Sequence, residues 1–219
     1  MTPILPSTQI DTETTRVRTP RDGLHRITFE SPDIAMLASP TSCVNDVCIN
    51  GCIPILFAAL EVPDEHPYAV FSTFDLLRAS SDDENLWRVT RHTKFWTKDV
   101  WIIPIHRPSS AHWVLCLAHI TRRELRLFDS LAEKTPWHAD VDVCSVLYVI
   151  PPLLSTYPQN IMKLIFRLSS IAKRMHPETQ LDFENESWTA RPTLVSPIPH
   201  DSLCALLILE ARGLADKWT

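Results

Sequence analysis

The chain has 219 residues, of which 45% are hydrophobic, and its 21 basic and 26 acidic side chains give a net charge of −5. This length and composition predict one globular domain with a full hydrophobic core, and they exclude a mostly disordered chain. The mildly acidic balance gives no general basis for nucleic-acid binding. The apolar stretches are also shorter than the roughly 18 to 20 residues that span a bilayer.

Glycine is scarce, since Gly23, Gly51 and Gly213 are the only three in the sequence, against 18 prolines. A phosphate-binding P-loop and a dinucleotide fingerprint both need clustered glycines, so both are excluded. The nucleophile elbow of the α/β-hydrolases is excluded as well, because no serine has a glycine two positions away on both sides.

The six cysteines are predicted to be reduced thiols of an intracellular protein, because the N-terminus lacks the basic start and apolar core of a secretion signal. Three of them are spaced five and four residues apart, which is a weak sign of a metal site. The sequence has no CxxC or HExxH motif, and helical spacing explains this trio better, so no metal site is predicted. The trio is Cys43, Cys48 and Cys52.

In chain order, residues 1–24 are rich in Thr, Pro and Arg without a period and are predicted to be a flexible tail preceding a domain over 25–219. From Ser42 onward, apolar residues follow the i, i+3, i+4, i+7 rule of an amphipathic helix, with Ser42 as the expected cap. Pro54 lies inside this pattern, so we expect a kink, or the end of a first segment near Ile53.

The middle of the chain changes to short segments rich in Val, Ile, Leu and aromatic residues, which predict consecutive strands over 99–107, 112–120 and 124–129. Pro104 indicates that the first of these is an edge strand or contains a bulge. Helical patterns resume over 141–150, 161–173 and 203–214, the last of them apolar on nearly every face and expected to be buried. Helices at both ends of a central sheet make the predicted fold class α+β.

Three residues can carry chemistry. His112 begins one predicted strand and Asp129 ends the next, so the two could form the base and orienting carboxylate of a nucleophilic triad. Cys204 falls in the first turn of the last predicted helix, where the helix dipole lowers the pKa of a thiol. Taken alone, each residue also fits a structural role: a surface histidine, a turn-forming aspartate and an apolar core cysteine.

His112-Trp113, the stretch Leu127-Phe128-Asp129-Ser130-Leu131 and a cysteine opening a late apolar helix together resemble the ubiquitin-like-protein (SUMO, or sentrin) specific cysteine proteases, in the divergent form found in fungal genomes. The similar stretches keep the family order and cover about residues 40 to 215. The others are Val44–Cys52, Phe71–Phe74, Trp101–Arg107 and Trp188–Pro192.

This resemblance implies a papain-like α+β fold, with a central mixed sheet flanked by helices and a buried helix that carries the nucleophile. It implies cleavage after the C-terminal Gly-Gly of a SUMO-class modifier, with Cys204 as nucleophile, His112 as general base and then acid, and Asp129 fixing the imidazole tautomer. Trp113 would roof the narrow channel that holds the diglycine tail.

The same resemblance implies no metal and no organic cofactor. The expected partner is a ubiquitin-like modifier or its conjugates. Nucleic acid and membrane are not expected as partners, the chain is expected to be a monomer, and its compartment is the nucleus or the cytoplasm.

The sequence departs from the family pattern around the nucleophile. Ile198 stands where the family has a glutamine whose amide helps to hold the oxyanion, and His200 is the neighbouring residue that could donate instead. Leu203 and Ala205 flank Cys204, where the family has Asp and Gly. The terminal helix that closes the domain in relatives is expected to be absent from this sequence. The alternative function is therefore an impaired pseudo-protease that binds a ubiquitin-like partner without cleaving it.

Overall fold

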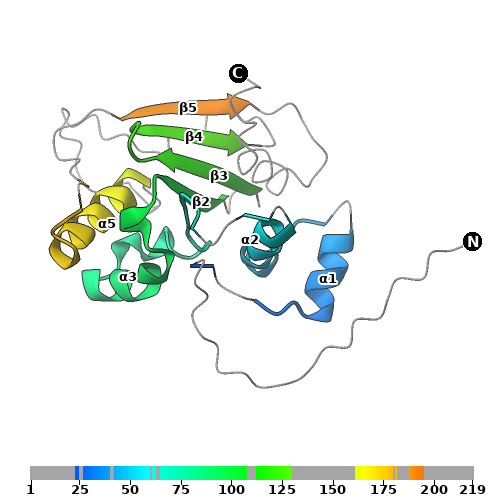
Figure 1. Ribbon diagram of the computed structural model, residues 1–219. Coiled ribbons are helices and arrows are strands. Elements are labelled where there is room, and N and C mark those ends of the chain that lie inside the picture. Colours follow the sequence, from blue (N-terminus) through cyan, green and yellow to red (C-terminus); the bar gives the residue numbers. More distant parts are fainter. Residues whose placement is uncertain are drawn as a thin grey trace, which may run out of the picture.

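The computed structural model describes residues 23–24, 27–39, 42–59, 61–62, 65–107, 112–129, 161–179, 181 and 188–194. These residues form a five-stranded mixed sheet with helices packed against it, as Figure 1 shows. The predicted α+β class, with a central mixed sheet flanked by helices, is confirmed. The helices expected over 141–150 and 203–214 lie outside the described residues.

The sheet has the order β1-β2-β3-β4-β5. The three central strands, β2 (Val100–Arg107), β3 (His112–His119) and β4 (Glu124–Asp129), are antiparallel and agree with the predicted segments. The two outer strands, β1 (Tyr68–Val70) and β5 (Thr189–Leu194), each run parallel to their neighbour and were not predicted. Three residues are too few to show a period in β1, and Pro192 interrupts the strand signal in β5.

Pro104 lies in β2, which has a strand on either side, and it pairs with Leu115 in an unbroken register. The expected edge strand or bulge at this position is therefore wrong. Phe71 donates its backbone N–H to the Ile102 carbonyl at 2.9 Å, so the backbone hydrogen-bonding groups of Ile102 point toward β1. Because these groups alternate along a strand, those of Pro104 point to the same side. The pairing of β1 with β2 ends at Ile102, before Pro104 is reached. The N–H that Pro104 lacks is therefore not needed for the pairing between these two strands.

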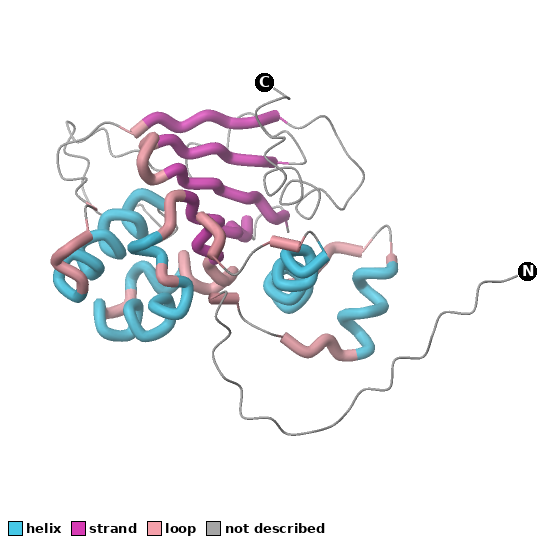
Figure 2. Tube along the Cα trace, viewed as in Figure 1, coloured by secondary structure: helices cyan, strands magenta, loops and turns pink. Residues whose placement is uncertain are grey.

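Both faces of the sheet are covered, and Figure 2 shows helices on either side of the strands. Alternate strand residues such as Ile103 and Cys116 face α3 (Asp83–Thr90) and α5 (Ile161–Met175), and α5 agrees with the helix predicted over 161–173. The intervening residues, such as Ile102 and Leu117, pack with Ile53 and Phe57 of α2 (Asp46–Ala59). Leu24, near the predicted boundary between tail and domain, is buried in this second cluster.

Helix α2 begins and ends differently from the prediction. The side chain of Asn45, not Ser42, accepts the backbone N–H of Cys48 at 2.8 Å and caps the helix. The helix runs through Pro54 to Ala59, so the expected end near Ile53 is wrong. Ile53 and Phe57 are both buried against the sheet, and this packing on either side of Pro54 holds the helix together.

Short elements complete the described part of the chain. Helix α1 (Ser31–Ala38) precedes α2, and three 3₁₀ turns connect β1 with β2 on either side of α3: η1 (Leu77–Ser80), η2 (Arg91–Thr93) and η3 (Phe95–Thr97). Helices α3 and α5 are joined at the surface, where Asp83 accepts hydrogen bonds from Arg167 and Arg174. None of the described helices has the length and apolar character needed to cross a bilayer.

Candidate active site

His112 and Asp129 lie in contact at one end of the adjacent central strands β3 and β4. The Nε2 atom of His112 is 2.8 Å from Oδ1 of Asp129. An ionised carboxylate can only accept hydrogen bonds, so Nε2 carries the proton in this contact and Nδ1 remains as the basic nitrogen of a neutral ring. The pair therefore has the arrangement of a general base oriented by a carboxylate.

Strand register brings the two residues together across 17 positions of sequence. Val114 pairs with Asp129 across β3 and β4, so these two side chains lie on the same face of the sheet. His112 is two residues before Val114 in the same strand and therefore shares that face. The contact follows from the lengths of β3 and β4 and the turn that joins them.

Arg107 completes the cluster and was not identified from the sequence. It ends β2 directly opposite His112, and its Nη1 donates to Oδ2 of Asp129 at 2.5 Å. The side chains of Arg107, Asp129 and His112 are 6%, 8% and 12% exposed, so the ion pair is largely shielded from water. The sequence did contain a signal for Arg107: it ends one predicted strand and His112 begins the next, so the two residues were expected to be neighbours across the connection.

Trp113 points to the opposite face of the sheet from His112. Its indole N–H donates to the carbonyl of Val44 at 2.9 Å, just before α2, and its ring lies 4.6 Å from the ring of His106. His106 is its partner in the β2–β3 register. The indole is thus held between the sheet and the start of α2, on the face of the sheet opposite the His112–Asp129 contact.

Asn45 fixes the backbone that Trp113 contacts. Its Nδ2 donates to Oδ1 of Asp33 at 3.0 Å, while its Oδ1 caps α2 through Cys48. The hydrogen bond from Asn45, with a second from the Glu30 backbone, lowers the pKa of Asp33. Asn45 therefore links α1 to α2 at the residue that follows Val44.

Three of the predicted site residues, Cys204, Ile198 and His200, lie outside the described residues. Among the described cysteines, Cys43 is exposed, and Cys48 is buried with its thiol donating to the Asp33 carbonyl at 3.7 Å. Burial raises the pKa of the Cys48 thiol. Within the described residues, no group of three or more His, Cys, Asp or Glu side chains is arranged to hold a metal ion.

Residues 77–181 match the catalytic-domain model of the Ulp1 protease family, described as its C-terminal catalytic domain. This segment belongs to the Ulp1 protease family. It includes β2, β3 and β4, and with them the His112–Asp129 contact. The family recognised from the sequence motifs is confirmed.

Solved structures of Ulp1-family enzymes share the fold. One is the SUMO protease Ulp1 with its catalytic cysteine oxidised to a sulfonic acid, at a TM-score of 0.53 and 16% identity, covering 87% of this chain and 76% of that one. A second is a de-sumoylating protease, at a TM-score of 0.53 and 18% identity, covering 88% and 72% respectively. A comparison with curated proteins finds no match.

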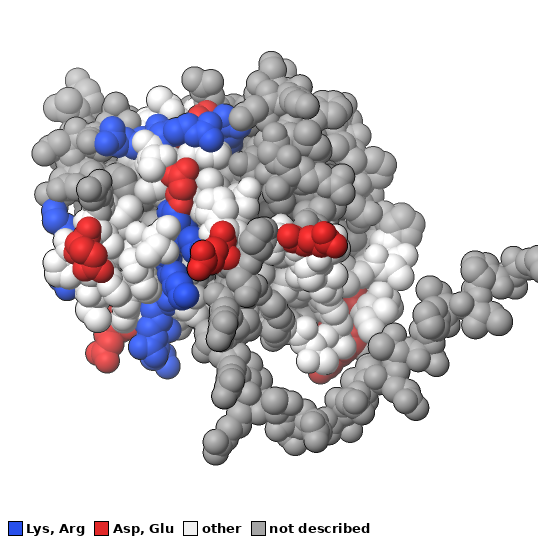
Figure 3. All heavy atoms as spheres, in the orientation of Figure 1, with Lys and Arg blue, Asp and Glu red and all other residues white. Residues whose placement is uncertain are grey.

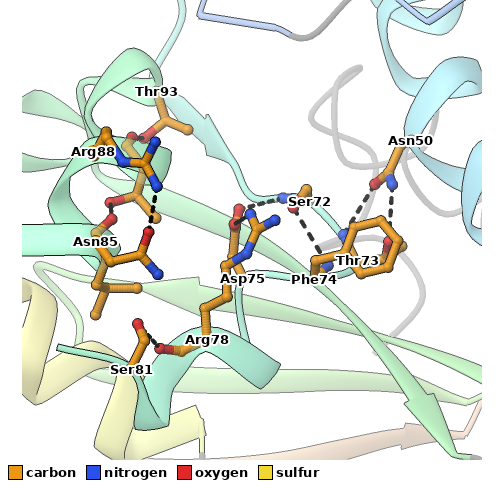
Figure 4. Close-up of polar contacts among 12 residues, drawn as sticks. Asn50, Ser72, Thr73, Phe74, Asp75, Arg78, Ser81, Asn85, Arg88 and Thr93 are labelled. Carbon is orange, nitrogen blue, oxygen red and sulfur yellow. Dashed lines mark hydrogen bonds and ion pairs between the residues drawn. The ribbon is translucent and has the colours of Figure 1, made fainter.

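The structure also has a pocket of about 300 Å³ between α2 and the turn that follows β1. Asn50 of α2 accepts the backbone N–H of Thr73 at 3.0 Å and donates to the Thr73 hydroxyl at 2.8 Å, as Figure 4 shows. In the same turn Asp75 accepts the Ser72 backbone N–H at 2.7 Å and pairs with Arg78 at 3.4 Å. These contacts fix the pocket wall.

On one face of the molecule (Figure 3), charged side chains of both signs are mixed. On the face drawn in Figure 3, Asp and Glu side chains lie among the Lys and Arg side chains of the described residues. This mixture matches the small net charge of the chain.

Proposed function

We propose that this chain is a cysteine peptidase that cleaves after the C-terminal Gly-Gly of a SUMO-class modifier, releasing it from a precursor or from a lysine side chain. Cys204 is the proposed nucleophile, His112 the general base and then acid, and Asp129 the orienting carboxylate. The observation that carries the proposal is the 2.8 Å contact between His112 and Asp129 within the segment that matches the family.

The proposed reaction begins with transfer of the Cys204 thiol proton to Nδ1 of His112. The thiolate attacks the carbonyl carbon of the terminal glycine, and the resulting oxyanion collapses to a thioester as the imidazolium returns the proton to the leaving amine. Water, deprotonated by His112, then hydrolyses the thioester and regenerates the thiol. Asp129 accepts the Nε2 hydrogen bond throughout and stabilises the imidazolium when it forms.

Trp113 is proposed to roof the channel for the modifier tail. Its indole is anchored on the Val44 carbonyl and lies tilted beside the His106 ring, so it forms a fixed wall rather than a mobile flap. A wall held this way admits an extended strand without side chains and rejects one with them. That property would select a diglycine terminus.

The decisive experiment is incubation of the chain with SUMO, ubiquitin and related modifiers that carry a C-terminal electrophile, followed by intact mass measurement and peptide mapping. A single adduct on Cys204 with one modifier supports the proposal. Because Cys43 is an exposed thiol, Cys43→Ser is the matched control and should still form the adduct, whereas Cys204→Ser should not. An adduct that persists in Cys204→Ser would overturn the nucleophile assignment.

A second candidate is binding of a SUMO-class modifier without cleavage. It is favoured by Ile198, which offers no donor to an oxyanion, and by Leu203 and Ala205 beside the cysteine. The same incubation separates the two functions. Absence of any adduct, together with saturable binding of an unmodified modifier measured by calorimetry, would support the binding function.

A further inference from the structure

We propose that Arg107 is a positioning residue, which holds the Asp129 carboxylate in the orientation that His112 requires. This inference deepens the proposed function and rests on it for its catalytic consequence. The geometry itself involves only described residues. Nothing in the triad implied by the family resemblance assigns a role to this arginine.

Asp129 uses its two oxygens for two different partners. Oδ2 accepts from the Arg107 guanidinium at 2.5 Å, and Oδ1 faces Nε2 of His112 at 2.8 Å. The two oxygens belong to one carboxylate, so rotation about the bond that joins it to the rest of the side chain would disturb both contacts together. Charge-assisted hydrogen bonds of this kind are about twice as strong as neutral ones.

The three residues are fixed by backbone pairing as well. Arg107 and His112 are direct partners between β2 and β3, and Asp129 pairs with Val114 between β3 and β4. The cluster therefore spans three adjacent strands at their ends. The arginine at the end of β2 reaches one oxygen of the carboxylate while the imidazole contacts the other.

Burial makes the loss of this charged partner costly. The Asp129 side chain is 8% exposed, and a buried carboxylate that loses a charged partner is left with an uncompensated charge. Without Arg107, the carboxylate would gain by turning toward water or toward another donor. Either rotation would lengthen its hydrogen bond to His112, and the carboxylate would no longer hold the imidazole proton on Nε2.

The test compares Arg107→Met, which removes charge and donors but keeps most of the side-chain length, with Arg174→Met as the matched control. Arg174 also forms an ion pair, with Asp83 on the surface between α3 and α5, away from this cluster. We expect Arg107→Met to lower kcat about 10- to 100-fold, the range typical when a residue that orients a catalytic ligand is removed, with KM nearly unchanged. Arg174→Met should retain both constants.

The second readout does not depend on cleavage. In protein labelled with ¹⁵N-histidine, the downfield Nε2–H proton of His112 reports its hydrogen bond to Asp129, and His112→Gln assigns the signal. We expect this resonance in the wild type and in Arg174→Met, its loss in Arg107→Met, and its recovery in Arg107→Lys, which keeps the charge. Should the wild type cleave no modifier, the proposed function fails while this signal still decides the role of Arg107.

A double-mutant cycle completes the test. If Arg107 acts through Asp129, adding Arg107→Met to Asp129→Asn should change kcat by less than about twofold, because both substitutions disrupt the same interaction between Asp129 and His112. Additive losses would contradict the inference, and so would an unchanged resonance in folded Arg107→Met. If Arg107→Met does not fold, Arg107→Lys and Arg107→Gln supply the comparison: the inference requires the resonance to be retained with Lys and lost with Gln.

Discussion

At the scale of single residues, Asp129 is the residue that connects Arg107 and His112 at the ends of the central strands. The carboxylate is buried and engages an imidazole on one oxygen and a guanidinium on the other. A carboxylate in this position keeps the proton of His112 on Nε2 and leaves Nδ1 basic. In the proposed mechanism, this basic nitrogen is the atom that accepts the proton of the thiol.

Replacing Asp129 with Asn should test this role directly. The amide can keep the shape of the side chain, but it presents a donor that favours the wrong tautomer of His112. On the proposed mechanism we expect kcat for a SUMO-class substrate to fall by about 10³- to 10⁴-fold. Steady-state cleavage of a fluorogenic diglycine substrate checks this value. A loss smaller than about tenfold would show that His112 does not depend on the carboxylate.

Ile198 offers the opposite experiment, in which activity is gained. A donor in the oxyanion hole typically contributes about 10²–10³ in rate, so Ile198→Gln should raise kcat by at least about tenfold. The measurement is single-turnover cleavage by both proteins. His200→Ala is the companion variant. If His200 already supplies the donor, its replacement lowers the rate and Ile198→Gln brings no increase.

At the scale of elements, the start of α2 connects the helical layer to the candidate site. Asn45 caps this helix and holds Asp33 of α1, and the preceding residue, Val44, accepts the indole N–H of Trp113. One side chain thus sets both the first turn of α2 and the position of the wall proposed for the substrate channel. In the proposed mechanism, Asn45 therefore couples local stability to substrate selection.

Removing this cap should destabilise the protein and loosen Trp113. We expect Asn45→Ala to lower the free energy of unfolding by about 1–2 kcal/mol, as for other helix caps, and to raise KM for the diglycine substrate. Urea unfolding and steady-state kinetics check the two effects. Asp82 caps α3 by accepting the Asn85 backbone N–H at 2.8 Å, so Asp82→Ala is the matched control. It should cost similar stability and leave KM unchanged, and a raised KM in both variants would contradict the coupling.

At the scale of the whole molecule, the sheet separates two apolar layers and is buried on both faces in its central strands. His119 lies at the end of β3 inside this arrangement and is 1% exposed. Burial lowers the pKa of His119, and the charges of Arg122 and Arg126 add to this effect. The imidazole is therefore held neutral in the folded protein at a pH where the unfolded chain would bind a proton.

This shift predicts a loss of stability on acidification. Because the folded pKa lies below the unfolded value of about 6.5, the contribution of His119 is fully present above that pH and falls as the pH drops toward the folded pKa. Urea unfolding of the wild type and of His119→Gln from pH 7.5 to 5 measures it. The wild type should lose more stability than the variant over this range, and equal losses would exclude His119 as the cause.

Much of this molecule could be predicted from local patterns. Short segments rich in Val, Ile, Leu and aromatic residues predicted the three central strands, and the apolar periodicity over 161–173 predicted α5, because burial selects apolar residues at these positions. His112 and Asp129 were identifiable because each stands at the end of such a strand. The family followed from the order of the motifs around them.

Other features required the folded structure, because they depend on contacts between residues distant in the sequence. Packing of Ile53 and Phe57 against the sheet keeps α2 continuous through Pro54, against the local preference of proline. The short strand β1 exists only because β2 offers it backbone partners. The role proposed for Arg107 depends on the register of three strands, which brings a guanidinium and a carboxylate 22 residues apart into contact. A local sequence pattern cannot predict a contact of this kind.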